Sequence, residues 1–166
     1  MNNKIFFLLV GFLFVTNASF GKTKENLKNF VVNPSFEEIK DGQPVGWYQV
    51  GIFPGVEFIV DDTALEGKKS LLISNKKQDV IDKFGPVNWA QDITGNIPKD
   101  KSLNLTVCVK TQKVKGLAAV ALQCWEKDEI IRFGTTQDKN YFNGTNDWAK
   151  MNFTVKIPQK TDKIRI

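Results

Sequence analysis

The fold is decided by SLNLTVCVKTQKVKGLAAVALQCW, residues 102–125, in which apolar side chains recur at every second position. Within 103–109, Leu and Val alternate with Asn, Thr and Cys. A period of two is typical of a β-strand with one buried face, whereas a helix needs a period near 3.6. The turn-forming residues QKVKG at 112–116 separate this alternating run from a second apolar run. The stretch therefore predicts a β-hairpin with strands at 102–111 and 117–126.

The same alternation continues along the rest of the chain. Near the end, polar residues alternate with a second apolar set: Met151, Phe153, Val155 and Ile157. Groups rich in Gly, Pro, Asn and Asp, such as KDGQP at 40–44, separate the runs, and no stretch keeps a helical period. Short strands at this spacing favour an all-β sandwich. The expected strands are 30–36, 46–50, 56–61, 69–74, 87–93, 102–111, 117–126, 130–136, 148–157 and 162–166.

The first residues predict a signal peptide at 1–21, because MNNK and the apolar run IFFLLVGFLFV precede the small-x-small pattern Ser19-Phe20-Gly21. Residues 22–29 are polar and aperiodic, which predicts a disordered lead-in. Residues 30–166 then form one β-sandwich domain, long enough to bury a core. The expected location is secreted, periplasmic or at the cell surface, with no membrane contact after cleavage. An uncleaved signal anchor is the alternative.

Composition excludes several classes of function. The chain contains no His, which removes Ser-His and Cys-His nucleophile pairs and His-ligated metal sites. Its net charge of +5 is spread without a cluster of Lys and Arg, so nucleic acid is not an expected partner. Glu37 and Glu38 are adjacent, and neighbouring side chains on a strand point to opposite faces, so they cannot act together as a glycosidase pair. We therefore expect no enzymatic activity.

Seven motifs in this order resemble those of galactose-binding-like jelly-roll domains, above all carbohydrate-binding modules of families four, nine and twenty-two. A similar domain occurs as an N-terminal accessory region of secreted bacterial hydrolases. The resemblance covers residues 30–166. The motifs are NPSFEE at 33–38, PVGW at 44–47, GKKSLLI at 67–73, WAQDI at 89–93, LNLTVCVKT at 103–111, VKGLAAVALQCW at 114–125 and GTNDWAKMNFTVKIP at 144–158.

The resemblance implies a galactose-binding-like jelly roll that is missing its last strand, because alternation in DKIRI still runs at Ile166. Either the chain is a fragment or its sheet keeps an open edge. In the family, acidic residues of the last strand hold a structural calcium ion together with an early Glu. The resemblance thus implies Glu37 as a calcium ligand, and the alternative is a solvated charge. It also implies that Trp47 packs in the core.

The phase of the predicted hairpin indicates a candidate binding face. If Leu103 to Val109 and Leu122 point into the core by alternation, the residues between them share the other face. That face combines one aromatic plane with amide and ammonium groups, which is what a pyranose needs. Trp89 and Gln91, one strand earlier, extend it; burial of both Trp residues in the core is the alternative. The candidate ligand-binding residues are Trp125, Gln123, Lys110, Trp89 and Gln91.

Phase also predicts that Cys108 and Cys124 point to opposite faces and remain free thiols, since a disulfide needs close, facing Cβ atoms. The function expected from these observations is a secreted, non-catalytic carbohydrate-binding module that binds a polysaccharide or glycan on a sheet face. The alternative is an accessory or interaction domain of a secreted hydrolase, without a sugar ligand of its own. The partner would then be a neighbouring hydrolase domain.

Overall fold

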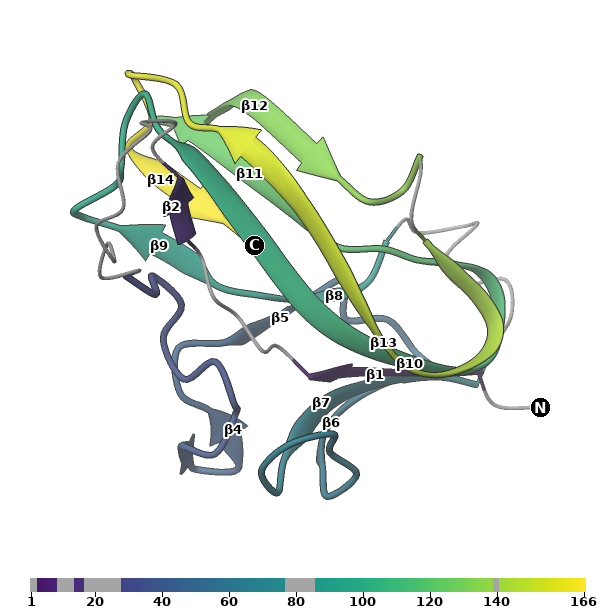
Figure 1. Cartoon of the computed structure of the whole chain (residues 1–166). Coiled ribbons are helices and arrows are strands. Elements are labelled where there is room, and N and C mark those ends of the chain that lie inside the picture. Colours follow the sequence, from purple (N-terminus) through teal and green to yellow (C-terminus); the bar gives the residue numbers. More distant parts are fainter. Residues whose placement is uncertain (1–2, 9–13, 17–27, 77–85, 139–140) are drawn as a thin grey trace, which may run out of the picture.

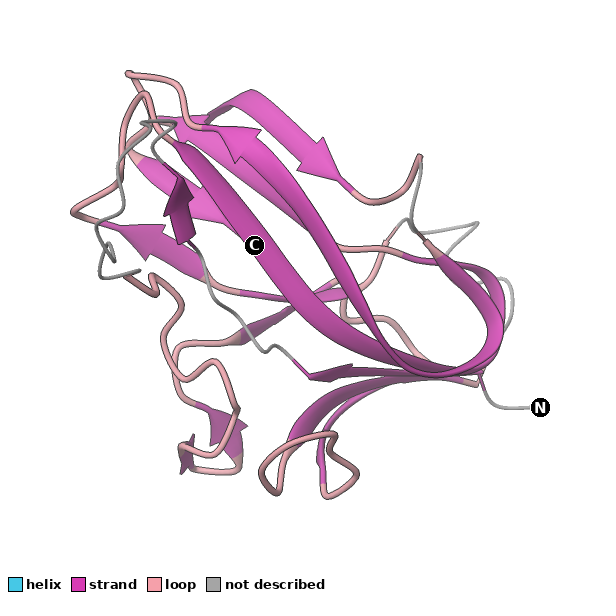
Figure 2. Cartoon of the chain, viewed as in Figure 1, coloured by secondary structure: helices cyan, strands magenta, loops and turns pink. Residues whose placement is uncertain are grey.

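The computed structural model describes residues 3–8, 14–16, 28–76, 86–138 and 141–166, the first two segments as backbone only (Figure 1). Every regular element of these residues is a β-strand (Figure 2), which confirms the all-β class. None of their segments is a helix that could span a membrane. The strands are β1 (Asn3–Leu8), β2 (Phe14–Thr16), β3 (Ile39–Lys40), β4 (Gln43–Pro44), β5 (Tyr48–Val50), β6 (Val56–Asp61), β7 (Ser70–Asn75), β8 (Asn88–Ala90), β9 (Asp92–Thr94), β10 (Ser102–Ala118), β11 (Ala121–Glu126), β12 (Glu129–Thr135), β13 (Phe142–Lys156) and β14 (Lys163–Arg165).

Two larger antiparallel sheets make up the body of the protein. The six-stranded sheet has the order β13-β10-β1-β7-β6, with β2 also paired to β10. The four-stranded sheet has the order β12-β11-β14-β9. Two short ribbons, β3-β4 and β5-β8, complete the structure. Apolar side chains from both larger sheets meet in one core, as in a β-sandwich.

The core forms where the alternation of the sequence predicts it. On β10, Leu103, Leu105, Val107 and Val109 are at most 1% exposed. They lie beside the inward residues of β13, with Leu103 paired to Val155 and Val107 to Met151. The four-stranded sheet contributes the facing layer, because Leu122, Cys124, Ile164 and Ile93 are also buried. The predicted phase of both halves of 102–125 is therefore confirmed.

The predicted pairing of these halves is wrong. Strand β10 does not turn back at 112–116; it continues to Ala118 and stays paired with β13, while β11 lies in the other sheet. The residues predicted to form a turn instead cause irregularities in the β10–β13 register. Lys113 and Gly116 adopt positive φ values of 56° and 138° there. Bulges of this kind strengthen the twist of a strand without ending it.

The expected strand at 30–36 is also not formed. Asn33 and Phe36 adopt positive φ values of 47° and 61°, which interrupt an extended strand. The Asn33 side chain replaces ladder bonds, because its Nδ2 donates to Glu38 O at 2.8 Å and its Oδ1 accepts from Glu38 N at 3.0 Å. Trp47 closes this loop: its Nε1 donates to Val32 O at 3.2 Å, and it packs edge-on to Phe36. At 9% exposure Trp47 is a core residue, as predicted.

The backbone of the predicted signal peptide takes part in the six-stranded sheet. Strand β1 lies between β7 and β10 and is antiparallel to both, in a register that pairs Phe6 with Leu72 and Lys110. Strand β2 pairs with the start of β10. Residues 1–2, 9–13 and 17–27, which include the predicted cleavage point and most of the lead-in, lie outside the described residues. The signal peptide stays a prediction.

Candidate binding surface on the four-stranded sheet

The outer face of the four-stranded sheet carries two rows of side chains that run across its strands. Because Cys124, Ile164 and Ile93 point into the core, the residues that alternate with them point outward. Pairing between strands then fixes each row. The first row is Phe133, Gln123, Arg165 and Asp92, and the second is Ile130, Trp125, Lys163 and Thr94. We call these eight residues the outer platform.

Trp125 is the central aromatic residue of the outer platform, and it is partly exposed rather than part of the core. Its Nε1 donates a hydrogen bond to Gln123 Oε1 at 3.2 Å. Lys163 Nζ lies 4.4 Å and Arg165 Cζ 5.2 Å from the centroid of its ring, so both cations interact with the π-system. Two of the predicted site residues, Trp125 and Gln123, are thus brought together on an accessible face.

A charged triad borders the platform. Arg165 Nε and one terminal nitrogen donate to the two oxygens of Asp92 at 2.7 and 2.9 Å, a bidentate ion pair. Tyr48 OH donates to the same carboxylate at 2.7 Å. The Arg165 hydrogen bonds lower the pKa of Asp92. Burial, followed by the hydrogen bond to Asp92, raises the pKa of Tyr48 to about 12. The carboxylate is therefore held in its charged form.

Sequence reasoning missed Asp92, Arg165 and Tyr48 as members of this surface. Alternation in DKIRI does place Lys163 and Arg165 on one face, which was the available signal. The local pattern does not reveal that β14 lies between β11 and β9 in the sheet. That long-range pairing sets Arg165 beside both Gln123 and Asp92.

Trp89 and Gln91 do not belong to the outer platform, because both are buried. Trp89 is 8% exposed, donates its Nε1 to Leu72 O at 3.4 Å and packs edge-on to Phe58. Gln91 is 2% exposed. Its Oε1 accepts a hydrogen bond from Val32 N at 2.7 Å, and its Nε2 donates one to Val32 O at 2.9 Å. The alternative reading of Trp89 as a core residue is the one that the structure supports.

Lys110 is separated from Trp125 because the two lie in different sheets. Its Nζ forms an ion pair with Asp147 at 2.8 Å, on the β10–β13 ribbon. The expectation that Lys110 shares a face with Gln123 and Trp125 is wrong for the same reason as the predicted hairpin: alternation assigns a face within a strand but does not choose the sheet.

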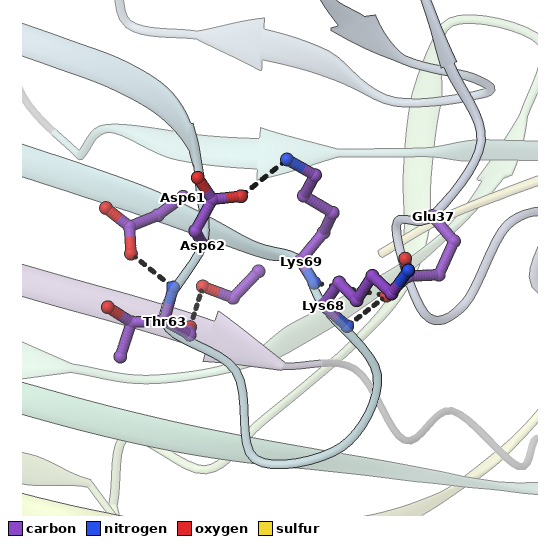
Figure 3. A network of polar contacts seen from close by, with 7 residues as sticks. Glu37, Asp61, Asp62, Thr63, Lys68 and Lys69 are labelled. Carbon is purple, nitrogen blue, oxygen red and sulfur yellow. Dashed lines mark hydrogen bonds and ion pairs between the residues drawn. The ribbon is translucent and has the colours of Figure 1, made fainter.

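Glu37 holds a loop in place (Figure 3). Its Oε1 accepts hydrogen bonds from the backbone N–H groups of Lys68 at 2.7 Å and Lys69 at 3.1 Å. Nearby, Asp61 caps a turn by accepting from Thr63 N at 2.7 Å, and Asp62 pairs with the Lys69 ammonium, which raises the pKa of Lys69. The carboxylates drawn in Figure 3 thus bond to the loop itself.

Among the described residues, no three His, Cys, Asp or Glu side chains converge to hold a metal ion. Glu37 as a calcium ligand stays a prediction. It can be checked by following the unfolding temperature of the protein and of Glu37→Ala in calcium titrations, where only the former would respond.

Both cysteines are free thiols, as predicted. They lie on strands of different sheets, Cys108 on β10 and Cys124 on β11. Cys124 is in the core as its phase requires, whereas Cys108 is 4% exposed although it alternates with core residues. Burial raises the pKa of both thiols, which keeps them protonated and unreactive.

No protein-family model and no curated protein matches the sequence. The fold and the outer platform therefore carry the functional argument.

Proposed function

We propose that the protein is a secreted, non-catalytic carbohydrate-binding module with a galactose-binding-like jelly roll, and that it binds a glycan on the outer platform. The observation that carries this proposal is the partly exposed Trp125 ring, fixed by Gln123 and two cations on the outer face of a sheet. An aromatic plane surrounded by hydrogen-bonding groups suits a pyranose, which has an apolar face and a hydroxyl rim.

The contacts around Trp125 favour binding because they order the ring in advance. A side chain held by a hydrogen bond and by cation–π contacts loses little rotamer entropy when a ligand stacks on it. Gln123 keeps its amide nitrogen as a donor, since its oxygen takes the indole bond. Phe133, which is 52% exposed and paired with Gln123, adds a second apolar side chain to the same surface.

The charge state of Asp92 supports a binding role over glycosidase activity. A general acid needs a pKa raised toward neutrality, and a glycosidase needs two carboxyl groups across one bond. Asp92 is the carboxylate of the outer platform, and its pKa is lowered by Arg165. Its oxygens accept bonds from Arg165 and Tyr48, so they are engaged in holding the surface together.

Affinity electrophoresis of the full chain against a panel of soluble polysaccharides tests this proposal. We expect retardation by at least one polysaccharide, and its loss in Trp125→Ala. Tyr141→Ala is the matched control, because Tyr141 is an exposed aromatic residue that precedes β13 of the other sheet. Retardation that is absent throughout the panel, or unchanged in Trp125→Ala, would contradict the proposal.

A second candidate is an accessory domain that contacts a neighbouring hydrolase domain and binds no sugar. It is favoured by β12, which is an edge strand and exposes Ile130 at 47% and Phe133 at 52%. Exposed apolar residues on an unpaired strand edge suit contact with another polypeptide. The electrophoresis experiment separates the two candidates, because this one predicts no retardation by any polysaccharide.

A further inference from the structure

We propose that the glycan recognised by the outer platform is acidic, and that Lys163 binds its carboxylate group. This inference rests on the proposed function and names the ligand class. Arg165 is neutralised by its bidentate pair with Asp92. Lys163 interacts with the Trp125 ring at 4.4 Å and forms no ion pair with a carboxylate of any described residue.

The acidic neighbours of Lys163 and Trp125 in the sequence are engaged elsewhere. Asp162 precedes Lys163, but its Oδ2 accepts a hydrogen bond from Lys127 N at 2.6 Å. Glu126 follows Trp125, but its carboxylate lies 3.9 Å from Lys160 Nζ. Lys163 therefore forms no salt bridge with a described carboxylate, although its ammonium contacts the Trp125 ring and its charge helps to lower the pKa of Asp92.

The position of Lys163 places this charge where a bound sugar would meet it. Lys163 is paired with Trp125 across β14 and β11, so the ammonium and the ring belong to one row. The cation–π contact holds the ammonium over the Trp125 ring, so a sugar that stacks on the part of the ring left exposed would lie next to this charge. A pyranose stacked on Trp125 would therefore carry a ring carboxylate within reach of Lys163. A charge-assisted hydrogen bond at a partly exposed site strengthens binding by about tenfold.

A neutral sugar would use this surface less well. Lys163 would lose part of its hydration without gaining an opposite charge, which offsets part of the stacking energy. The structure thus favours polysaccharides of uronic acids over neutral polysaccharides of the same backbone.

The experiment compares full-length protein on three acidic polysaccharides, polygalacturonate, alginate and glucuronoxylan, each beside a form whose carboxylates are esterified or reduced. We expect the acidic form of the recognised backbone to bind about tenfold more tightly, with the difference reduced by salt. In Lys163→Gln the ratio of acidic to neutral affinity should fall to about one, whatever the loss of the cation–π contact with Trp125 does to both forms alike. Lys160→Gln is the control, since Lys160 is 76% exposed and lies outside the platform.

Gln123→Glu gives an independent test. Glutamate keeps an oxygen for the Trp125 N–H group and adds a negative charge in the row beside Lys163. It should lower the ratio of acidic to neutral affinity by about tenfold, because loss of the amide donor affects both forms whereas the added negative charge opposes only the acidic one.

Each result has a distinct meaning. Equal binding of acidic and neutral forms would overturn this inference and leave the proposed function intact. An acidic preference that survives Lys163→Gln would overturn the assignment of Lys163. Failure of every polysaccharide, acidic or neutral, would overturn the proposed function and this inference with it.

Discussion

Trp125 donates its indole N–H to the side-chain oxygen of Gln123, two residues earlier on the same strand, at 3.2 Å. Residues i and i+2 of a strand face the same way, so this bond orients the aromatic ring on the outer platform. Gln123 is therefore a positioning residue for Trp125 in addition to a candidate sugar contact.

Replacing Gln123 by Leu should weaken glycan binding by about fivefold, because the indole loses the acceptor that fixes its orientation. The free energy of unfolding should fall by less than about 1 kcal/mol, since both side chains are partly exposed. Affinity electrophoresis and urea unfolding measure the two effects. Gln123→Glu restores the acceptor but not the amide donor, so it should bind neutral glycans more tightly than Gln123→Leu does. Equally weak binding of neutral glycans by both variants would exclude a positioning role.

The Asp92–Arg165 pair should stabilise the fold by about 1 kcal/mol after allowance for solvent screening of two partly exposed side chains. Because the pKa of Asp92 is lower in the folded protein than in the unfolded chain, this contribution is complete above the unfolded value near 4 and is lost as the pH falls through the lower, folded pKa. In urea unfolding, Asp92→Asn should therefore be less stable than the wild type at pH 7, and this difference should shrink as the pH is lowered below 4. A constant difference would contradict the pair's role.

The Tyr48 hydroxyl should lose its proton at an unusually high pH. Its folded pKa of about 12 lies above the ordinary value of 10.0, so its contribution to stability is present below pH 10 and is lost as the pH rises toward 12. In a spectrophotometric titration of tyrosinate, a phase centred near pH 12 should be present in the wild type and absent in Tyr48→Phe. A late phase that survives in Tyr48→Phe would show that another residue causes it.

Gly67→Ala should destabilise the protein more than Gly95→Ala. Both glycines have nearly the same positive φ, 75° and 76°, so both substitutions carry the same backbone penalty, about 1 kcal/mol. A Cβ at Gly67 would lie 2.5 Å from Glu37 Oε1, whereas a Cβ at Gly95 meets no atom within 4 Å. We expect an additional loss of about 1 kcal/mol for Gly67→Ala in thermal unfolding, as the Glu37 bonds to Lys68 and Lys69 are displaced.

Introducing Gly67→Ala and Gly95→Ala into the Glu37→Ala variant tests this explanation. Without the carboxylate, the two Gly→Ala substitutions should cost the same, which is the coupling that a double-mutant cycle measures. Additive effects would mean that Glu37 does not restrain the loop.

Much of the fold was predictable because alternation is a local property. The inward phase of Leu103 to Val109, and of Met151 and Val155, follows from a period of two and is confirmed by their burial. Partner choice is not local. The signals at 112–116 predict a turn, but continued pairing with β13 outweighs them and converts them into bulges.

The same distinction explains the candidate site. Trp125 and Gln123 could be placed together because they lie two residues apart on one strand. Gln91 has the same spacing from Trp89, yet both residues are buried. The side-chain amide of Gln91 forms hydrogen bonds with the backbone of Val32, which is far away in the sequence. Whether a distant loop covers the outward face of a strand depends on tertiary structure, and the periodicity of the sequence does not reveal it.

The place of β1 in the six-stranded sheet has a consequence for the timing of assembly. β1 ends at Leu8, whereas its neighbours β7 and β10 begin at Ser70 and Ser102, so the earliest strand to leave the ribosome pairs with strands that are synthesised much later. Contacts this distant in sequence close slowly. The six-stranded sheet therefore closes late in folding, only after the chain from β1 to β10 has been synthesised.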